Sequence, residues 1–350
     1  MKDYATETMT CGLDLGDTWS HVCLLDGSGE ITEETRVRTT PAAIGAFFGR
    51  HEPMRVVFEV GTHSRWVDQE VVGAGHETVV ANPRRVQLIS RNERKTDRVD
   101  AELLARLGRV DPGLLKPIHH RGESAQKDLV LLRARAALLR ARTLLINCVR
   151  GQVKSAGARI KSCSADSFGK RTEEIPEALR PALAPMMEQV RRMTAEIRTY
   201  DKAIKALADE DPEISNLQTT GGVGPITAVA FVRTLEDPNR FASGRAAAAY
   251  VGLVPKRSQS GAVDPQLRIS KCGDTYLRQL LVTCAQHILG PFGSDSDLRR
   301  WGLKLAERGG KNAKKRAVVA VARKLVVVLY RLWKSADAYN PFPRGVPAAA

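Results

Sequence analysis

The stretch Cys11-Gly12-Leu13-Asp14-Leu15-Gly16-Asp17-Thr18 places a carboxylate inside a short apolar run, between two glycines. Such a run is typical of a buried β-strand. A charge in a buried strand is costly unless it is paired or bound to a cation. Asp14 is therefore a candidate functional residue, and its strand is the first element of the predicted fold.

Outward from this stretch, strand and helix patterns alternate up to about residue 110. Glycine turns and alternating apolar residues predict strands at 11–15, 21–25, 31–38, 55–60 and 77–81. Helical periodicity predicts helices at 41–48, 64–72 and 97–107. Three meandering strands followed by alternating helices and strands is the order of the RNase H-like fold, an order that other α/β folds share.

Three more acidic residues are expected to lie near Asp14 in such a fold. Glu59 stands at the end of its own predicted strand, and Asp97 and Asp100 are three residues apart on one helical face. Asp97 alone could be an ordinary first-turn acid after a Thr96 cap. Together, the four carboxylates form the oxygen-rich set that Mg²⁺ prefers, which predicts metal-dependent chemistry on a nucleic-acid phosphate.

The overall charge of the chain favours polyanionic partners. The 350 residues contain 54 Lys and Arg against 39 Asp and Glu, a net charge of +15, which indicates nucleic acid first. No uninterrupted apolar stretch reaches the roughly 18 residues of a membrane span, so we expect no membrane partner. The N-terminus lacks the apolar core of a signal peptide, which predicts a cytoplasmic protein.

Four segments follow from the patterns along the chain. We predict an α/β domain at 1–118, a helical coiled-coil linker at 119–212, a mainly helical C-terminal domain at 213–340 and a disordered Pro/Gly/Ala-rich tail at 341–350. The linker contains a heptad seam of apolar residues, Met186, Val190, Met193, Ile197, Tyr200, Ile204 and Leu207. This seam fits either a coiled coil with a partner chain or a helix packed within its own bundle.

Clusters of basic residues mark candidate nucleic-acid contacts. The helix predicted over 121–161 is rich in cations, among them Arg133 and Arg140. The densest C-terminal cluster is Lys311, Lys314, Lys315 and Arg316. A glycine turn at 217–225 between two helices also fits a contact to the phosphate backbone.

One competing interpretation starts from the same first stretch. Residues 12–18 also suit the phosphate loop of actin-like sugar kinases and ATPases, in which the aspartate holds a metal ion. Such chains usually carry further glycine-rich nucleotide loops, which this sequence lacks. The basic charge and the helical middle segment also argue against this interpretation.

Several motifs resemble a known family, the DEDD insertion-sequence transposases of the one-ten group. The N-terminal motifs are those around Asp14 and Glu59 and the run Lys95-Thr96-Asp97-Arg98-Val99-Asp100-Ala101. The C-terminal motifs are Ala249-Tyr250-Val251-Gly252-Leu253-Val254-Pro255, Ser260-Gly261 and Arg268-Ile269-Ser270-Lys271-Cys272-Gly273-Asp274 with Leu277-Arg278. Asp17 stands where many relatives carry a basic residue, which puts no ligand in doubt.

The resemblance implies an RNase H/RuvC-like domain, a coiled-coil linker and a C-terminal transposase domain with a serine nucleophile. It maps the metal ligands to Asp14, Glu59, Asp97 and Asp100, and the nucleophile to Ser260. It also implies a recombinase that is guided by a structured noncoding bridge RNA. Dimers would assemble into a tetramer across donor and target DNA duplexes.

Two other functions remain open at this stage. A RuvC-like nuclease would hydrolyse DNA with water, would not need Ser260 and would form no covalent intermediate. A nucleic-acid-binding scaffold with a degenerate site would use neither the serine nor the metal, but the complete set of four carboxylates argues against it. Ser258 lies two residues from Ser260 and competes with it for the role of nucleophile.

Overall fold

The computed structural model describes residues 9–82, 96–261, 263–265 and 267–343. The chain forms two compact units, Met1–His120 and Arg121–Ala350, which we call the N-terminal unit and the C-terminal unit. Lys95 of the acidic motif lies outside the described residues. Each unit is described by itself below.

The N-terminal unit is built on a five-stranded sheet in the order β3-β2-β1-β4-β5. The strands are β1 (Thr10–Asp14), β2 (Trp19–Leu25), β3 (Ile31–Arg38), β4 (Arg55–Glu59) and β5 (Glu77–Ala81). The first three strands are antiparallel neighbours, whereas β4 and β5 run parallel to β1. This mixed sheet confirms the RNase H-like arrangement predicted from the order of the elements.

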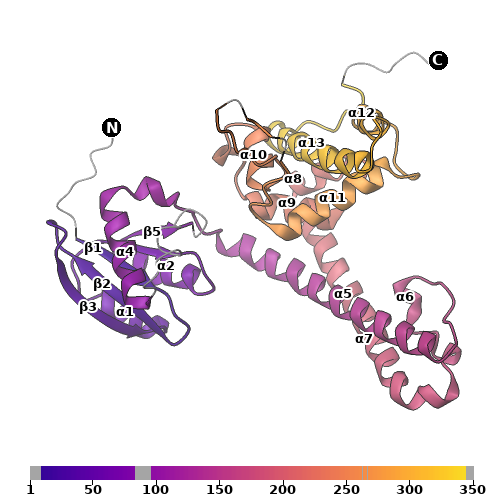
Figure 1. Cartoon of the computed structure of the whole chain (residues 1–350), viewed down its shortest axis with the longest axis horizontal. Coiled ribbons are helices and arrows are strands. Elements are labelled where there is room, and N and C mark those ends of the chain that lie inside the picture. The colour runs from indigo at the N-terminus through magenta and orange to yellow at the C-terminus, as the bar shows by residue number, and fades with distance from the viewer. Residues whose placement is uncertain (1–8, 83–95, 262, 266, 344–350) are drawn as a thin grey trace. The chain divides into compact units, whose positions relative to one another are not determined.

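Helices cover both faces of this sheet (Figure 1). On one face, α1 (Pro41–Phe48) and α2 (Ser64–Gly73) pack on a core that includes Leu13 and Phe58. On the other face lies α4 (Asp97–Val110), whose Ala101 and Ala105 contact Cys23 and Leu25 of β2. A short 3₁₀ helix, Pro112–Leu115, follows α4. Successive strand residues therefore alternate between two apolar layers.

The C-terminal unit begins with two long helices, α5 (Glu123–Ser155) and α7 (Arg180–Glu210), joined by a segment that contains α6 (Ala165–Phe168) and two 3₁₀ turns, Thr172–Glu174 and Glu177–Leu179. The two helices pack against each other along their length (Figure 1). Arg142, buried between them, donates hydrogen bonds to Asp166 at 2.7 Å and to Thr194 at 3.1 Å. The middle segment is thus a helical hairpin within one chain.

The buried positions of α7 in this hairpin differ in part from the predicted heptad seam. Val190, Ile197 and Ile204 of that seam are buried as expected, whereas its other four residues are only half-buried. The neighbouring positions Leu183, Met187, Thr194 and Ala208 are buried instead. The buried stripe is shifted because α5 of the same chain covers it, which favours the intramolecular alternative for these positions.

The remaining helices form the body of the C-terminal unit. They are α8 (Pro212–Leu217), α9 (Pro225–Leu235), α10 (Gly244–Tyr250), α11 (Thr275–Leu289), α12 (Asp297–Ala306) and α13 (Ala313–Ser335), with a 3₁₀ turn at Pro238–Arg240. Leu129 of α5 and Ile204 of α7 share one apolar core with these helices. The hairpin and the C-terminal helices therefore pack as one unit, and the functional division at residue 212 stays a prediction.

The predicted disordered tail starts too early at residue 341. The Pro341 carbonyl accepts a hydrogen bond from the Asp297 amide at 2.9 Å, and the Phe342 ring lies 5.2 Å from the Arg300 guanidinium. Both residues are held because α12 offers them a polar and a cationic partner. Residues 344–350 lie outside the described residues. In the described part of the chain, no helix combines the length and apolarity needed to cross a membrane.

Candidate functional site

Asp14 and Glu59 end two neighbouring parallel strands at the same edge of the sheet. Leu13 of β1 is paired with Phe58 of β4, so Asp14 and Glu59 are the next residues along each strand. Alternation directs both side chains to the sheet face opposite Leu13 and Phe58, the face on which α4 packs. Both are half-buried.

Close approach of α4 to β1 brings two more carboxylates to this edge. A Cβ atom at Gly12 would lie 1.9 Å from the Ala101 carbonyl oxygen, so only glycine allows the helix this near. Asp97 and Asp100 lie in the first turn of the same helix. The helix begins at this point because the Thr96 hydroxyl accepts a hydrogen bond from the Val99 amide at 3.3 Å.

A second contact fixes the direction of that first turn. Arg98 Nε donates to Glu34 Oε1 of β3 at 2.8 Å, and an Nη atom donates to the second carboxylate oxygen. Asp97, on one side of Arg98, has 72% of its side chain exposed. Asp100 is only 6% exposed. The helix thus presents one solvent-facing and one buried carboxylate at the edge of the sheet.

The four carboxylates influence one another electrostatically. The pKa of Asp14 is raised from 3.8 to about 6, first by burial and then by the charges of Asp100, Asp97 and Glu59, in that order. Like charges raise a carboxyl pKa only when they are near it. The four residues singled out in the sequence therefore share one electrostatic environment in the N-terminal unit.

The sequence patterns did not single out His21, which belongs to the same environment. His21 is paired with Asp14 across the β1–β2 ladder, and its Nε2 lies 3.7 Å from Asp97 Oδ2. Its charge lowers the pKa of Asp14. A histidine in an apolar strand is common and carries no functional signal in the sequence. Only the strand register shows that His21 lies beside Asp14.

The carboxylate set fits a divalent cation in chemistry. All four side chains offer hard oxygen ligands, and a cation would offset the repulsion that, after burial, adds to the raised pKa of Asp14. Within the ranges that the structure describes, no three His, Cys, Asp or Glu side chains are already arranged to hold a metal ion. The Asp97 carboxylate lies instead against His21. A bound cation would therefore have to draw these side chains together.

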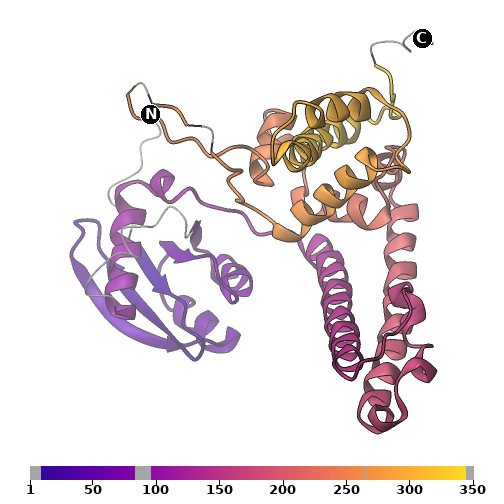
Figure 2. The ribbon, with the colours of Figure 1, turned by 45° about the vertical axis from the view of Figure 1, so that its right-hand side comes forward.

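Ser260 lies at the tip of a long exposed loop between α10 and α11 in the C-terminal unit, which Figure 2 shows projecting from the helices. The amide of Lys256 donates to the Arg268 carbonyl at 2.9 Å, which pairs the two arms of the loop. At the tip, Ser260 and Val263 exchange backbone hydrogen bonds of 3.1 and 3.0 Å. Ser258 and Ser260 are both exposed, so exposure does not distinguish them.

The family-like motifs around this serine build the base of its loop. Arg278, 9% exposed, donates from Nη1 to the carbonyls of Val251 and Cys272, both at 2.9 Å. Gly252 has φ +79°, and a Cβ there would lie 2.0 Å from the Cys272 carbonyl oxygen. The arginine and the glycine thus hold the two ends of the loop together.

The basic residues predicted to contact nucleic acid differ in whether their charge is already paired within the chain. Lys311, Lys314, Lys315 and Arg316 are all exposed around the start of α13. Cations at a helix N-terminus oppose the helix dipole, so their position does not serve the stability of the helix. Arg140 is also exposed on α5, whereas Arg133 lies 3.5 Å from Asp274, the residue that caps α11.

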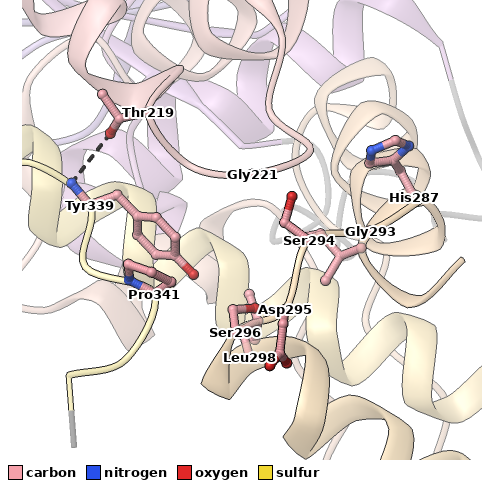
Figure 3. A pocket seen from close by; sticks show the side chains of 11 residues that line it. Thr219, Gly221, His287, Gly293, Ser294, Asp295, Ser296, Leu298, Tyr339 and Pro341 are labelled. Atoms are coloured by element: carbon pink, nitrogen blue, oxygen red, sulfur yellow. Dashed lines mark hydrogen bonds between the residues drawn. The ribbon is translucent and has the colours of Figure 1, made fainter. Parts of the chain in front are cut away.

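The predicted glycine turn lies between α8 and α9 and borders a pocket of about 220 Å³ (Figure 3). Gly221 and His287 line it from one side, and Ser294 and Tyr339 also face it. The Tyr339 amide donates to Thr219 Oγ1 at 3.3 Å. The turn packs against α11, since a Cβ at Gly222 would lie 3.0 Å from Ile288. Contact of this turn with DNA stays a prediction.

Comparison with protein families matches both units of the chain. The DEDD transposase model of the IS110 type matches residues 11–157, which include all four carboxylates. The model of the transposase IS116/IS110/IS902 family matches residues 214–296, which include Ser260 and Arg278.

Relatives align over most of the chain. It is 28% identical to a probable family 20 transposase of Pseudomonas aeruginosa, with 86% of this chain and 90% of the relative covered. It is 28% identical to the transposase for insertion sequence element IS1111A of Coxiella burnetii, over 94% and 90% of the two chains. A pilin gene-inverting protein of Moraxella bovis is 24% identical, over 79% and 78%. From these matches, the chain belongs to the IS116/IS110/IS902 family of insertion-sequence transposases.

Proposed function

We propose that the chain is a metal-dependent serine recombinase that cuts and rejoins DNA strands through a phosphoserine intermediate. The observation that carries this proposal is the shared electrostatic environment of Asp14, Glu59, Asp97 and Asp100 at one sheet edge. Carboxylates that repel one another at the edge of a sheet are suited to a cation and a phosphate. The exposed position of Ser260 supports its role as nucleophile.

The proposed reaction keeps the number of phosphate ester bonds constant. The Ser260 hydroxyl oxygen attacks a backbone phosphorus, one P–O ester bond of the strand breaks, and the serine proton ends on the released hydroxyl end. The hydroxyl end of an exchanged strand then attacks the phosphoserine, and Ser260 leaves with a proton. No external energy source is needed, because each step replaces one phosphate ester by another. The step requires Ser260 to reach the carboxylates of its own chain or of a second copy.

In this proposal the four carboxylates hold divalent metal, for which Mg²⁺ is the candidate. Bound there, the cation would supply Lewis-acid stabilisation of charge on the attacked phosphate. Asp14 and Glu59 provide ligands from the sheet, while Asp97 and Asp100 provide them from α4. Arg98, through its contact with Glu34, keeps that first helical turn in place.

The proposed partners are DNA and a guide RNA. A net charge of +15 suits two polyanions at once. The resemblance to bridge-RNA-guided recombinases suggests that a structured noncoding RNA selects donor and target duplexes, and that dimers assemble into a tetramer. Sequencing of RNA that copurifies with the chain, expressed beside its native flanking DNA, tests the guide. Recovery of no enriched flank-derived RNA would contradict it.

The basic residues at the start of α13 are proposed to contact phosphates. Replacing Lys311, Lys314, Lys315 and Arg316 by Gln should weaken DNA binding and lower the slope of log K against log salt by up to about 0.9 per lost contact. Lys205→Gln is the matched control, because Lys205 is paired with Asp209 at 2.7 Å. An unchanged slope in the quadruple variant would show that these cations do not contact nucleic acid.

A covalent-adduct trap tests the central proposal. The wild-type chain and the variants Ser260→Ala, Ser258→Ala and Asp14→Ala are expressed with native flanking DNA, denatured and examined for protein-bound DNA. We expect the adduct in wild type and Ser258→Ala, and its loss in Ser260→Ala and Asp14→Ala. Cut DNA without an adduct in any of the four chains would identify a hydrolytic RuvC-like nuclease instead.

A further inference from the structure

A row of charged side chains crosses the sheet face beside the start of α4. Asp14 of β1 is paired with His21 of β2, and His21 is paired with Arg36 of β3. Residues paired across neighbouring strands share one face. Across this face the side chains therefore change from acidic to basic in the order Glu59, Asp14, His21 and Arg36. Two strand spacings, about 10 Å, separate Asp14 of β1 from Arg36 of β3.

The basic end of the row is organised around one aromatic ring. Trp19 of β2 is paired with Arg38 and lies diagonal to Arg36. The guanidinium carbons of Arg36 and Arg38 lie 4.8 and 4.9 Å from the centroid of the Trp19 ring. Both arginines are exposed, and the ring is half-buried. We call these three residues the Trp19 cluster.

The charges of the Trp19 cluster have no acidic partner in the part of the chain that the structure describes. Among the described residues, no carboxylate lies within ion-pair distance of either arginine. Glu34, the acid on the same face of β3, is already engaged by Arg98. Cations on an edge strand often do no more than prevent pairing with the strands of other chains. Arg36 and Arg38, however, converge on an aromatic ring beside an acidic edge.

Their chemistry suits a nucleic-acid strand. Guanidinium groups bind phosphates with several donors, and aromatic or guanidinium planes stack on bases. The ring keeps both guanidinium groups over the same face as Asp14. A strand with one phosphate at the carboxylates would have its neighbouring nucleotides within reach of cations about 10 Å away.

We propose that the Trp19 cluster binds the DNA strand immediately next to the phosphate that is cleaved. This inference rests on the proposed function, since it takes the carboxylates as the cleavage site. In this role Arg36 and Arg38 hold flanking phosphates, and Trp19 positions both groups and stacks on a base. The cluster orients the strand and takes no part in bond breaking.

Binding and cross-linking on the full chain test this proposal without requiring cleavage. The Asp14→Asn chain is mixed with a single-stranded DNA that carries one 5-bromodeoxyuridine and is irradiated, and tryptic peptides bearing DNA are identified. We expect label on residues 3–36, which include Trp19, and at least about tenfold less of it with Trp19→Ala, the scale of losing one stacked base. Label confined to the C-terminal unit would overturn the proposal.

Affinity measurements supply the second readout. Arg36→Gln with Arg38→Gln should lower the affinity for the DNA strand and reduce the salt slope by about 1–2, whereas Arg50→Gln, an exposed arginine that follows α1, should not. Equal affinities for the double variant and the control would contradict the cluster. Label and loss seen only with an RNA strand of the same sequence would also overturn it. The two proposals can fail independently. If the proposed function is wrong, no Ser260 adduct forms even though the Trp19 cluster still binds DNA.

Discussion

The carboxylate edge of the N-terminal unit and the serine loop of the C-terminal unit present reactive groups in opposite ways. The carboxylates stand on two strands and a helix whose backbone approaches at Gly12. Ser260 stands at the tip of a loop whose base is fastened by Arg278. The backbone of the carboxylates is held in regular elements, whereas the serine stands on a loop that is fastened at its base.

Under the proposed function, this difference follows from the role of each group. Ligands of one cation need backbone positions that stay close together while their side chains adjust, and regular elements supply such positions. A nucleophile has to reach a phosphate and be reached by an incoming strand, and an exposed loop on a fixed base allows this. Removing a ligand should therefore abolish chemistry at once, whereas loosening the loop base should weaken it through positioning.

The largest effect is expected at the rigid edge. Asp100→Asn should slow strand cleavage by about three orders of magnitude or more, the range typical for loss of a catalytic group, while nucleic-acid binding stays intact. Cleavage of flanking DNA and binding are measured on the same preparations. Glu52→Gln, an exposed acid in the same unit, serves as control. A loss of less than tenfold would remove Asp100 from the metal ligands.

An intermediate effect is expected at the base of the serine loop. Arg278→Gln removes a guanidinium that satisfies two carbonyls and should destabilise the loop base by about 2–4 kcal/mol. We expect faster tryptic cleavage at Lys256 and a lower yield of adduct, with partial rescue by Arg278→Lys. Arg308→Gln, an exposed arginine, is the control. Unchanged proteolysis together with lost adduct would instead indicate that Arg278 contacts DNA.

The smallest effect concerns stability at the carboxylate edge. The folded-state pKa of Asp14, about 6, exceeds its ordinary value of 3.8. Stability contributed by the protonated carboxyl is therefore full below pH 3.8 and lost as the pH rises through 6. At pH 7 and without divalent cations, Asp14→Asn should be more stable than wild type by about 1–2 kcal/mol.

Thermal unfolding across pH 4–8 measures this difference. The stabilisation by Asp14→Asn should vanish toward pH 4, where the wild-type carboxyl keeps its proton, and Glu52→Gln should show no such pH dependence. A variant that is less stable than wild type at pH 7 would show that Asp14 is paired rather than repelled. It would also weaken the contrast between the mutually repelling carboxylates and the exposed serine loop.

Much of the N-terminal unit was predictable because its signals are local. The strand at Ile31–Arg38 and the helix at Pro41–Phe48 have the predicted bounds. Asp14, Glu59 and the Thr96-capped pair on α4 stood out because charges at strand ends and in a capped first turn are visible residue by residue. The seam on α7 was shifted because the choice of covering helix, α5, depends on a long-range contact.

Sequence alone thus indicated the α/β order, the four acids and the excess of basic residues, since periodicity and residue type can be seen without a partner, whereas Ser260 was singled out only through the family resemblance. Tertiary structure alone decided that His21 stands between Asp14 and Arg36, and that Trp19 gathers two arginines on the same face. Strand register made these neighbours, because hydrogen bonding between strands brings together residues that lie far apart along the chain.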